Sequence, residues 1–538
     1  MKLQRTCALS FLATLALLHP GDALAQTACS SLTSLALPNT VIQSATTVAP
    51  GPFTPPAGPP GAPPQPTVPI TVSFCRVKAI TSPVPGSSIV FEVWLPTTWN
   101  RKLMGIGNSG ANGEISFTLT SASLASSVNR GYAAVGTDTG HASSPTSGTW
   151  AVGFPERIVD NGTRSIGEVT AKAKGILAAF YGTGPSKNLT RSYFFGCSMG
   201  GRQGLMQAQR FPTAYDGVIS GAPVIDLPNL TAAGAFQAQQ LSGPGFFPAA
   251  KLPAIAAAVR AECDAVDGLV DGLVDDPRNC DWDPNTLVCS GPETNACLTQ
   301  AQASALEQLY KGPRRSDTSA KIYPGLERGG EDGFGPLGWS TSVTGPPSPL
   351  APPGTPGVAV LLSGAYINNV AFQNPNPLFK TFTFDFASDL DFVTAQLADL
   401  YNANNPDLTA FKNRGGKVLM YHGWSDPVVP PGGSVEYHKD VRQTLGTEQA
   451  LSTLRLFMAP GMEHCVGGTG PFLFDAVTAL ERWVEQGIAP ERIVATQVNL
   501  ATGAFVRTRP LCRYPRVARY DGSGDVNDAA NFVCEEPD

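Results

Sequence analysis

The feature that most constrains the fold is a β-prone run, a glycine-rich turn and a helix that follow one another around Ser198. The run is Tyr193-Phe194-Phe195, the turn has the pattern Gly-x-Ser-x-Gly, and residues 204–210 have a helical pattern. In such a segment the turn lifts the serine hydroxyl off the end of a sheet, and the helix N-terminus favours negative charge that develops beside it. The pattern alone would also fit an ordinary turn, but the flanking strand and helix favour a nucleophilic serine.

Strands and helices alternate on both sides of this turn. The alternation predicts a mostly parallel sheet with helices packed on it, and together with the serine turn it predicts the α/β-hydrolase fold. The β-prone segments are residues 70–77, 88–95, 102–106, 131–138, 192–195, 215–223, 416–423 and 454–458, and the main helical segments are residues 160–180, 435–444 and 471–486.

The alternation is interrupted between residues 225 and 411. This segment is rich in glycine and proline and contains four cysteines. We interpret it as a lid domain inserted into the hydrolase domain, which then comprises residues 26–224 and 412–538. The proline-rich run at residues 50–69 is expected to be extended surface chain or a linker.

The first 25 residues have the features of a signal peptide. Lys2 and Arg5 form a basic start, residues 9–18 form a short apolar run, and Ala23-Leu24-Ala25 fits a cleavage site. We therefore expect the protein to be secreted or periplasmic. Ten of the eleven cysteines follow this segment, and an even number in an exported chain predicts disulfides. Metal-binding thiols would require closely spaced C-x-x-C pairs, which the sequence lacks.

Charge and hydropathy narrow the possible partners. The net charge of -6 argues against binding to nucleic acid. No second apolar run is long enough to span a bilayer. We therefore expect neither a nucleic-acid partner nor a membrane anchor.

A serine hydroxyl is a poor nucleophile at neutral pH and needs a base that a carboxylate orients. In the α/β-hydrolase fold, the acid and then the histidine follow the serine along the chain. His464 lies in the loop after segment 454–458, where the base belongs, and Asp426 lies after segment 416–423, where the acid belongs. Asp440, on the helix that follows, is the weaker alternative for the acid.

The other four histidines are set aside as candidates for the base. His19 leaves with the signal peptide, and His141 precedes Ser198. His422 precedes the candidate acid. His438 lies in the middle of a helix, where a solvated side chain is expected.

A glycine-rich loop at residues 107–113 follows a strand upstream of the serine turn. The α/β-hydrolase fold places an oxyanion donor there, although a plain turn would have the same composition. We expect the backbone N–H groups of Met199 and Gly110 to receive the oxyanion.

Two cysteines flank the proposed nucleophile and base. Cys197 immediately precedes Ser198, and Cys465 immediately follows His464. If the serine and the histidine form a hydrogen bond, their neighbours come close together. The sequence therefore predicts a disulfide between Cys197 and Cys465.

Three motifs make the sequence similar to the tannase and feruloyl esterase family, whose relatives include mono(2-hydroxyethyl) terephthalate hydrolases. These are Gly-Cys-Ser-x-Gly-Gly at residues 196–201, His-Gly-Trp-Ser-Asp-Pro at residues 422–427 and Gly-Met-x-His-Cys at residues 461–465. The resemblance implies an exported serine esterase with a lid, which cleaves small or polysaccharide-linked esters of aromatic acids. It also pairs the remaining cysteines as Cys29–Cys75, Cys263–Cys280, Cys289–Cys297 and Cys512–Cys534.

The acidic loop at residues 264–275 has carboxylates three or four residues apart, with glycines for tight turns. Calcium binds six to eight oxygens in such surroundings, but an acidic solvated loop has the same pattern. The resemblance implies a structural calcium site in the lid. Its ligands would be the side chains of Asp264, Asp267 and Asp271 and the carbonyls of Leu269 and Leu273.

The resemblance also indicates two residues that contact the substrate. Leu227 matches a family position that packs on the acyl ring, and Val429 stands where terephthalate-monoester hydrolases can carry an aromatic residue. No lid arginine matches the one that those enzymes use for the free carboxylate, which favours esters of ferulate or other hydroxycinnamates. Gallate esters, as in a tannase, and terephthalate monoesters are the alternatives.

Three other functions are compatible with the fold. A lipase would have a larger apolar lid surface, and the expected lid is polar and held by cysteines; a peptidase is a further possibility. A non-catalytic binding protein would usually have lost a member of the Ser-His-Asp triad, and all three are present here. An esterase for aromatic acids is favoured over all three.

Overall fold

The computed structural model describes residues 27–537 apart from residues 119–121, 183–187, 334 and 346–355. The expected signal peptide, residues 1–25, lies outside the described residues. Among the helices of the described ranges, none has the length and apolar character needed to cross a membrane.

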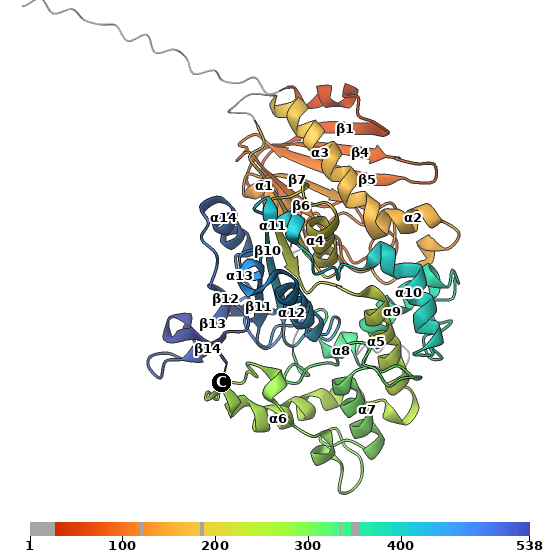
Figure 1. The fold of residues 1–538 in the computed structure, drawn as a ribbon, viewed down its shortest axis with the longest axis vertical. Coiled ribbons are helices and arrows are strands. Elements are labelled where there is room, and N and C mark those ends of the chain that lie inside the picture. Colours follow the sequence, from red (N-terminus) through yellow and green to blue (C-terminus); the bar gives the residue numbers. More distant parts are fainter. Residues whose placement is uncertain (1–26, 119–121, 183–187, 334, 346–355, 538) are drawn as a thin grey trace, which may run out of the picture.

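A nine-stranded mixed sheet forms the centre of the molecule, in the order β1-β4-β5-β7-β6-β8-β9-β10-β11 (Figure 1). Neighbours from β1 to β7 are antiparallel, and neighbours from β7 to β11 are parallel. The strands are β1 (Thr40–Val48), β4 (Phe74–Thr81), β5 (Ile89–Pro96), β6 (Lys102–Ile106), β7 (Ala133–Thr137), β8 (Arg191–Cys197), β9 (Gly217–Gly221), β10 (Lys417–Gly423) and β11 (Leu454–Ala459).

The register of the parallel strands brings their carboxyl ends to one edge. Cys197 of β8 lies opposite Gly221 of β9, and Gly423 of β10 lies opposite Ala459 of β11. The segments that carry the predicted nucleophile, acid and base each follow one of these strand ends. The sheet therefore brings Ser198, Asp426 and His464 to the same edge.

Helices cover both faces of the sheet because successive strand residues point to opposite sides. In β10, Leu419 packs in the core under α1 and α14, while Val418 and Met420 pack in the core under α4 and α12. Further along that second face, α3 covers β5 and β7. These helices are α1 (Leu124–Asn129), α3 (Ser165–Tyr181), α4 (Met199–Arg210), α12 (Gly432–Leu445) and α14 (Ala476–Gln486).

The chain leaves the sheet after β9 and returns at β10, and we call the segment between them the insertion (residues 222–416). Most of its helices gather at the lower end and along the right side of the molecule in Figure 1, whereas the last of them lies near the centre, beside α4. They are α5 (Leu227–Gln240), α6 (Leu252–Cys263), α7 (Gln300–Lys311), α8 (Trp339–Ser342), α9 (Val358–Gly364), α10 (Ser388–Tyr401) and α11 (Thr409–Asn413). The division into domains at residues 225 and 411 stays a prediction.

Smaller elements complete the fold. Strand pairs β12–β13 and β14–β15 come after α14 in the chain. The remaining elements are α2 (Pro155–Val159), α13 (Thr447–Leu451), β2 (Gly51–Phe53), β3 (Val68–Ile70), β12 (Arg492–Val498), β13 (Phe505–Cys512), β14 (Val517–Tyr520) and β15 (Phe532–Glu535).

The proline-rich run is not a free linker. Its ends pair as β2 and β3, and the ring of Phe53 packs edge-on against Trp94 with centroids 4.8 Å apart. Gln65 donates hydrogen bonds to the side chain of Glu114 and to the carbonyl of Ile115. The run is extended, as expected, but these contacts fix it to the hydrolase domain.

The ten cysteines of the described chain form five disulfides, and these are the five pairs expected from the sequence. Each pair has a Cα–Cα distance between 5.0 and 6.1 Å. The pairs are Cys29–Cys75, Cys197–Cys465, Cys263–Cys280, Cys289–Cys297 and Cys512–Cys534.

Candidate active site

Ser198 lies between β8 and α4 in a backbone conformation that few residues with a side chain adopt. Its φ of 64° and ψ of -126° place it in a sharp turn. A Cβ on Gly196 would lie 2.4 Å from the backbone of Gly200, and a Cβ on Gly201 would lie 2.3 Å from the carbonyl oxygen of Gly221. The glycines on both sides of the serine are therefore required by close packing of backbone against backbone.

The loop at residues 107–113 packs directly on the start of α4. A Cβ on Gly107 would lie 2.6 Å from the Cα of Gly200, and a Cβ on Gly200 would lie 2.8 Å from the carbonyl oxygen of Asn108. In the described part of the chain, no acceptor is bonded to the backbone N–H of Met199 or of Gly110. Neither amide is therefore committed to an acceptor, and their role as oxyanion donors stays a prediction.

Asp426 follows β10 and is fully buried with its carboxylate hydrogen-bonded on both oxygens. The backbone N–H groups of Val428 and Val429 donate to Oδ1, each at 2.9 Å. The ring of His464 bonds Oδ2 through Nδ1 at 2.7 Å. Burial alone would raise the pKa of Asp426, but the charge of His464 and hydrogen bonds from His422 and His464 hold it below its usual range.

His422 is a second histidine on the same carboxylate. Its Nε2 lies 3.0 Å from Oδ2 of Asp426 and 2.9 Å from the carbonyl oxygen of Val429. Because both neighbours accept hydrogen bonds, Nε2 carries the proton. Its Nδ1 lies 2.7 Å from Oγ of Ser434 on α12. The sequence reasoning set His422 aside, yet its position at the end of a strand and four residues before the acid was the available signal.

The disulfide between Cys197 and Cys465 joins the residue before Ser198 to the residue after His464, with the two Cα atoms 6.1 Å apart. The exposed fractions of Ser198, Asp426 and His464 are 6%, 1% and 2%. The predicted nucleophile, an ionised carboxylate and an imidazole bound to that carboxylate thus lie at one buried edge of the sheet.

A family model described as tannase and feruloyl esterase matches residues 75–535. The chain belongs to the tannase and feruloyl esterase family. An uncharacterized esterase of Xanthomonas campestris pv. campestris is 38% identical to this family member, over 95% of this chain and 91% of its own length. The mono(2-hydroxyethyl) terephthalate hydrolase of Piscinibacter sakaiensis is 34% identical, over 84% of this chain and 82% of its own.

The crystal structure of feruloyl esterase B from Aspergillus oryzae matches this family member with a TM-score of 0.82 and 27% identity, covering 94% of this chain and 99% of that one. The expected α/β-hydrolase fold is confirmed by this likeness. Because the chain belongs to this family and its relatives are named as esterases, it is a carboxylic ester hydrolase.

The two predicted substrate-contacting residues of this esterase lie in one apolar cluster that includes Met199, the residue after Ser198. Leu227 begins α5 of the insertion, Val429 follows Asp426, and both pack with Met199. Their exposed fractions are 2% and 1%. Tyr366, also of the insertion, donates a hydrogen bond to the carbonyl of Gly110 at 3.4 Å. The insertion thus closes over the edge of the sheet that carries Ser198.

Two of the alternatives considered from the sequence are excluded by position. His438 was expected to be solvated, but its exposed fraction is 1%, its ring packs edge-on against Tyr514, and burial lowers its pKa to about 4. The sequence could not indicate this because Tyr514 comes from the C-terminal segment. Asp440 is exposed on α12, whereas Asp426 holds the imidazole of His464.

The acidic loop of the esterase brings its carboxylates close together. Burial, together with the charges of Asp271 and Asp264, raises the pKa of Asp267. Oxygen donors that repel one another suit a hard cation. However, Asp271 is paired with Arg507 at 3.2 Å and with Arg509, and within the described ranges no group of three or more His, Cys, Asp or Glu residues is arranged to hold a metal ion. The calcium ligands, with the carbonyls of Leu269 and Leu273, stay a prediction.

Glu463, directly before the predicted base, was not singled out from the sequence. It is fully buried, and neither carboxylate oxygen has a hydrogen-bond partner in the described part of the chain. Glycines of the insertion surround it: a Cβ on Gly333 or Gly335 would lie 2.2 or 2.0 Å from its oxygens. Burial raises the pKa of Glu463 to about 8, and the charges of Asp426 and Asp332 act in the same direction.

Proposed function

We propose that this carboxylic ester hydrolase is a secreted or periplasmic serine esterase that cleaves esters of aromatic acids such as ferulate. The hydrogen bond between Nδ1 of His464 and the ionised Asp426 carries this proposal, because an imidazole oriented in this way leaves Nε2 to act as a base. The disulfide between the neighbours of Ser198 and His464 supports the same pairing.

In the first half of the proposed reaction, Oγ of Ser198 attacks the ester carbonyl carbon while Nε2 of His464 takes the hydroxyl proton. Asp426 keeps the proton on Nδ1 and stabilises the imidazolium. The N–H groups of Met199 and Gly110 hold the developing oxyanion. The bond from carbon to the alcohol oxygen then breaks, and His464 returns the proton to the leaving alcohol.

In the second half, water attacks the acyl-enzyme while His464 accepts one of its protons. The bond between the acyl carbon and Oγ of Ser198 breaks, and the serine recovers its proton from His464. The free aromatic acid then leaves. Over the two halves of the reaction, one ester and one water molecule give one acid and one alcohol.

The acyl group would lie in the apolar cluster that contains Leu227 and Val429. Both are aliphatic and offer no charge to a second carboxylate on the acyl ring. This supports a neutral or phenolic ring over the free carboxylate of a terephthalate monoester, although one relative carries the name of such a hydrolase. Gallate esters remain the alternative among phenolic acids.

A substrate panel tests the acyl preference. Initial rates would be measured for methyl ferulate, methyl gallate, mono(2-hydroxyethyl) terephthalate, a short triglyceride and a peptide amide. We expect the highest kcat/KM for methyl ferulate. A preference for the terephthalate monoester by tenfold or more would contradict the assignment, and turnover of the triglyceride or the peptide alone would exclude an aromatic-acid esterase.

We further infer that calcium binds the acidic loop within the Cys263–Cys280 disulfide and stabilises the insertion. Support comes from the donor set: three carboxylates and two carbonyls from a loop with glycines at its turns. The loop lies away from the triad along the chain. Its expected role is structural, with no part in the chemical steps.

A further inference from the structure

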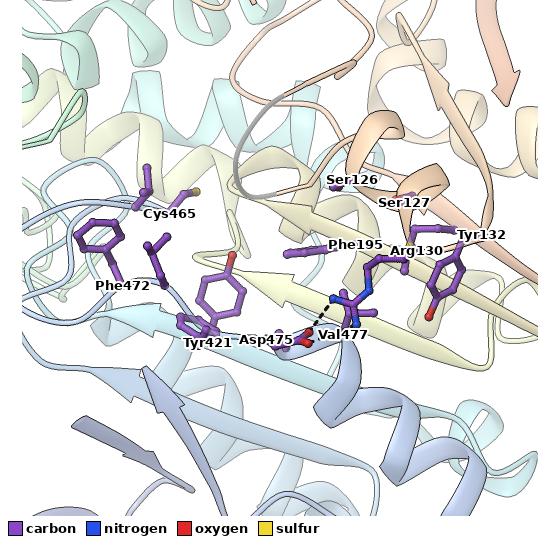
Figure 2. Close-up of a pocket in the computed structure, with 15 residues that line it drawn as sticks. Ser126, Ser127, Arg130, Tyr132, Phe195, Tyr421, Cys465, Phe472, Asp475 and Val477 are labelled. Atoms are coloured by element: carbon purple, nitrogen blue, oxygen red, sulfur yellow. Dashed lines mark hydrogen bonds and ion pairs between the residues drawn. The ribbon is translucent and has the colours of Figure 1, made fainter. Parts of the chain in front are cut away.

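A cavity of about 350 Å³ opens on the face of the sheet that carries α1 and α14. Strands β6, β8 and β10 form its floor, and the loop between His464 and α14 forms a wall (Figure 2). The side chains that matter here are Met104, Phe195, Tyr421, Cys465, Phe472 and Phe474. None of the lining residues is Ser198, Asp426 or His464, so the cavity is distinct from the candidate active site.

Tyr421 supplies this cavity with a hydrogen-bond donor that has no partner in the described part of the protein. The tyrosine is only 3% exposed, and its hydroxyl points between Cys465 and Phe195 in Figure 2. There it lies over Gly221, on which a Cβ would be 2.4 Å from the hydroxyl oxygen. Burial raises the pKa of Tyr421 well above its usual range, so the hydroxyl keeps its proton.

The polar mouth of the cavity carries no net charge. Arg130 and Asp475 form an ion pair there, with Nη1 and Oδ1 3.1 Å apart, and Arg130 also donates to Thr478 at 2.7 Å. Ser126 and Ser127 of α1 lie beside this pair. An ionised ligand would therefore find no free counter-charge at the mouth. A neutral ligand needs no counter-charge, so the mouth favours binding of a neutral molecule.

We propose that this cavity is a second binding site, for a neutral single-ring aromatic molecule that carries a hydrogen-bond acceptor. The ring packs against Phe195, Phe472 and Phe474, and the acceptor receives the hydroxyl proton of Tyr421. The volume and the mixture of aromatic walls with few polar groups are those of small-molecule sites. A ligand that accepts a hydrogen bond from a hydroxyl facing the cavity gains specificity in addition to apolar burial.

A ligand in this cavity would contact the disulfide next to the candidate active site. Cys465 lines the cavity and is bonded to Cys197, so the ligand lies against the disulfide that joins the neighbours of His464 and Ser198. The inference does not depend on the acyl preference proposed above, because it concerns a different set of residues.

Acetophenone is a suitable probe because it has one ring and one carbonyl acceptor and is not an ester. Its binding would be measured by calorimetry on the whole protein and on three variants. Ser126→Phe places a ring at the mouth, Ser126→Ala is its matched control, and Tyr421→Phe removes only the hydroxyl. Unchanged ester hydrolysis by the two Ser126 variants verifies that they are folded.

We expect saturable binding to the wild type and to Ser126→Ala, and at least tenfold weaker binding to Ser126→Phe. Tyr421→Phe should weaken binding about 2- to 10-fold, the value of one hydrogen bond. The proposal is overturned if the wild type shows no saturable binding, or if Ser126→Phe binds as the wild type does, because the probe would then occupy the ester site only. Equal affinity of Tyr421→Phe and the wild type would contradict the role of the hydroxyl.

Discussion

The carboxylate of Asp426 is held by four hydrogen bonds, and a second histidine supplies one of them. His422 donates from Nε2 to the same oxygen that binds His464. This donation draws charge away from the carboxylate and fixes its plane. His422 therefore positions the acid, and through it the imidazole that we propose as the base.

Removal of the His422 ring is expected to slow the reaction and to change its pH dependence. In His422→Ala the carboxylate of Asp426 loses one of the hydrogen bonds that hold its pKa below the usual range, so the carboxylate is protonated at higher pH than in the wild type. The acidic limb of the kcat/KM profile should move to higher pH, and kcat should fall about 10- to 100-fold, as expected for a lost hydrogen bond to a charged group.

Two further variants separate positioning from folding. His422→Gln restores a donor and should recover most of the rate. Ser434→Ala removes only the contact at Nδ1 and should have the smaller effect. A folded His422→Ala enzyme with the pH profile of the wild type would refute the positioning role.

Glu463 is expected to make the protein less stable as the pH rises. Its pKa is about 8 in the folded protein, whereas an unfolded glutamate titrates near 4.5. Between these values the folded state holds the proton and the unfolded state has lost it, so the free energy of unfolding falls as pH rises, by up to about 1.4 kcal/mol per pH unit. Above about pH 8 both states are ionised and the dependence ends.

Thermal unfolding of Glu463→Gln between pH 5 and pH 9 tests this. The variant should lose the decline that the wild type shows between pH 5 and pH 8. Glu448→Gln, at an exposed position of α13, is the matched control and should behave as the wild type. Equal pH dependence of Glu463→Gln and the wild type would show that the carboxylate does not stay protonated in the fold.

Among the elements, the 107–113 loop and α4 pack backbone against backbone beside Ser198. Gly200→Ala would place a Cβ 2.8 Å from the carbonyl oxygen of Asn108. The loop must then move away from the helix, carrying the amide of Gly110 with it. We expect kcat to fall about 10²-fold or more with little change in KM, the usual cost of a lost oxyanion donor.

Gly291→Ala is the control for this variant, because the glycine has a negative φ and a Cβ there meets nothing within 4 Å. It should leave kcat unchanged. Steady-state kinetics on methyl ferulate would compare the two. Wild-type activity of Gly200→Ala would mean that the loop does not supply an oxyanion donor.

The acidic loop is the element at which metal removal should be detected. If calcium binds there, chelation with EGTA should lower the Tm by several degrees, since a ligand at 100 times its Kd stabilises by about 2.7 kcal/mol. Added calcium should restore the Tm. Asp267→Asn should abolish the response and the exposed Asp281→Asn should keep it; an unchanged Tm after EGTA would refute the site.

At the scale of the whole molecule, features that depend on local pattern were predictable from the sequence. The strand β6 and the elbow at Ser198 are found where the pattern placed them, and β10 and β11 lie within a residue of the expected bounds. For each of these elements, the residues that predict it, namely the turn residues and the periodic apolar residues, lie within about ten positions of one another in the sequence. Asp426 and His464 could be chosen because the fold orders acid and base along the chain.

Features that depend on distant segments were not predictable. The order β5-β7-β6-β8 requires two crossovers that no short pattern encodes. The composition of the proline-rich run predicts surface chain or a linker, yet Phe53 in this run packs against Trp94. His438 and Glu463 are buried by Tyr514 and by glycines of the insertion, which lie 76 and about 130 residues away along the chain. When a distant segment buries a polar residue, the sequence on either side of that residue does not indicate the burial.

The most direct test of the account is the hydrolysis of methyl ferulate by Ser198→Ala beside the wild type. Ser126→Ala, outside the candidate active site, is the matched control. We predict turnover by the wild type and the control, and a loss of about 10³-fold or more in kcat for Ser198→Ala with its disulfides and Tm unchanged. A folded Ser198→Ala enzyme that still hydrolyses the ester at a rate near that of the wild type would contradict the assignment of the nucleophile.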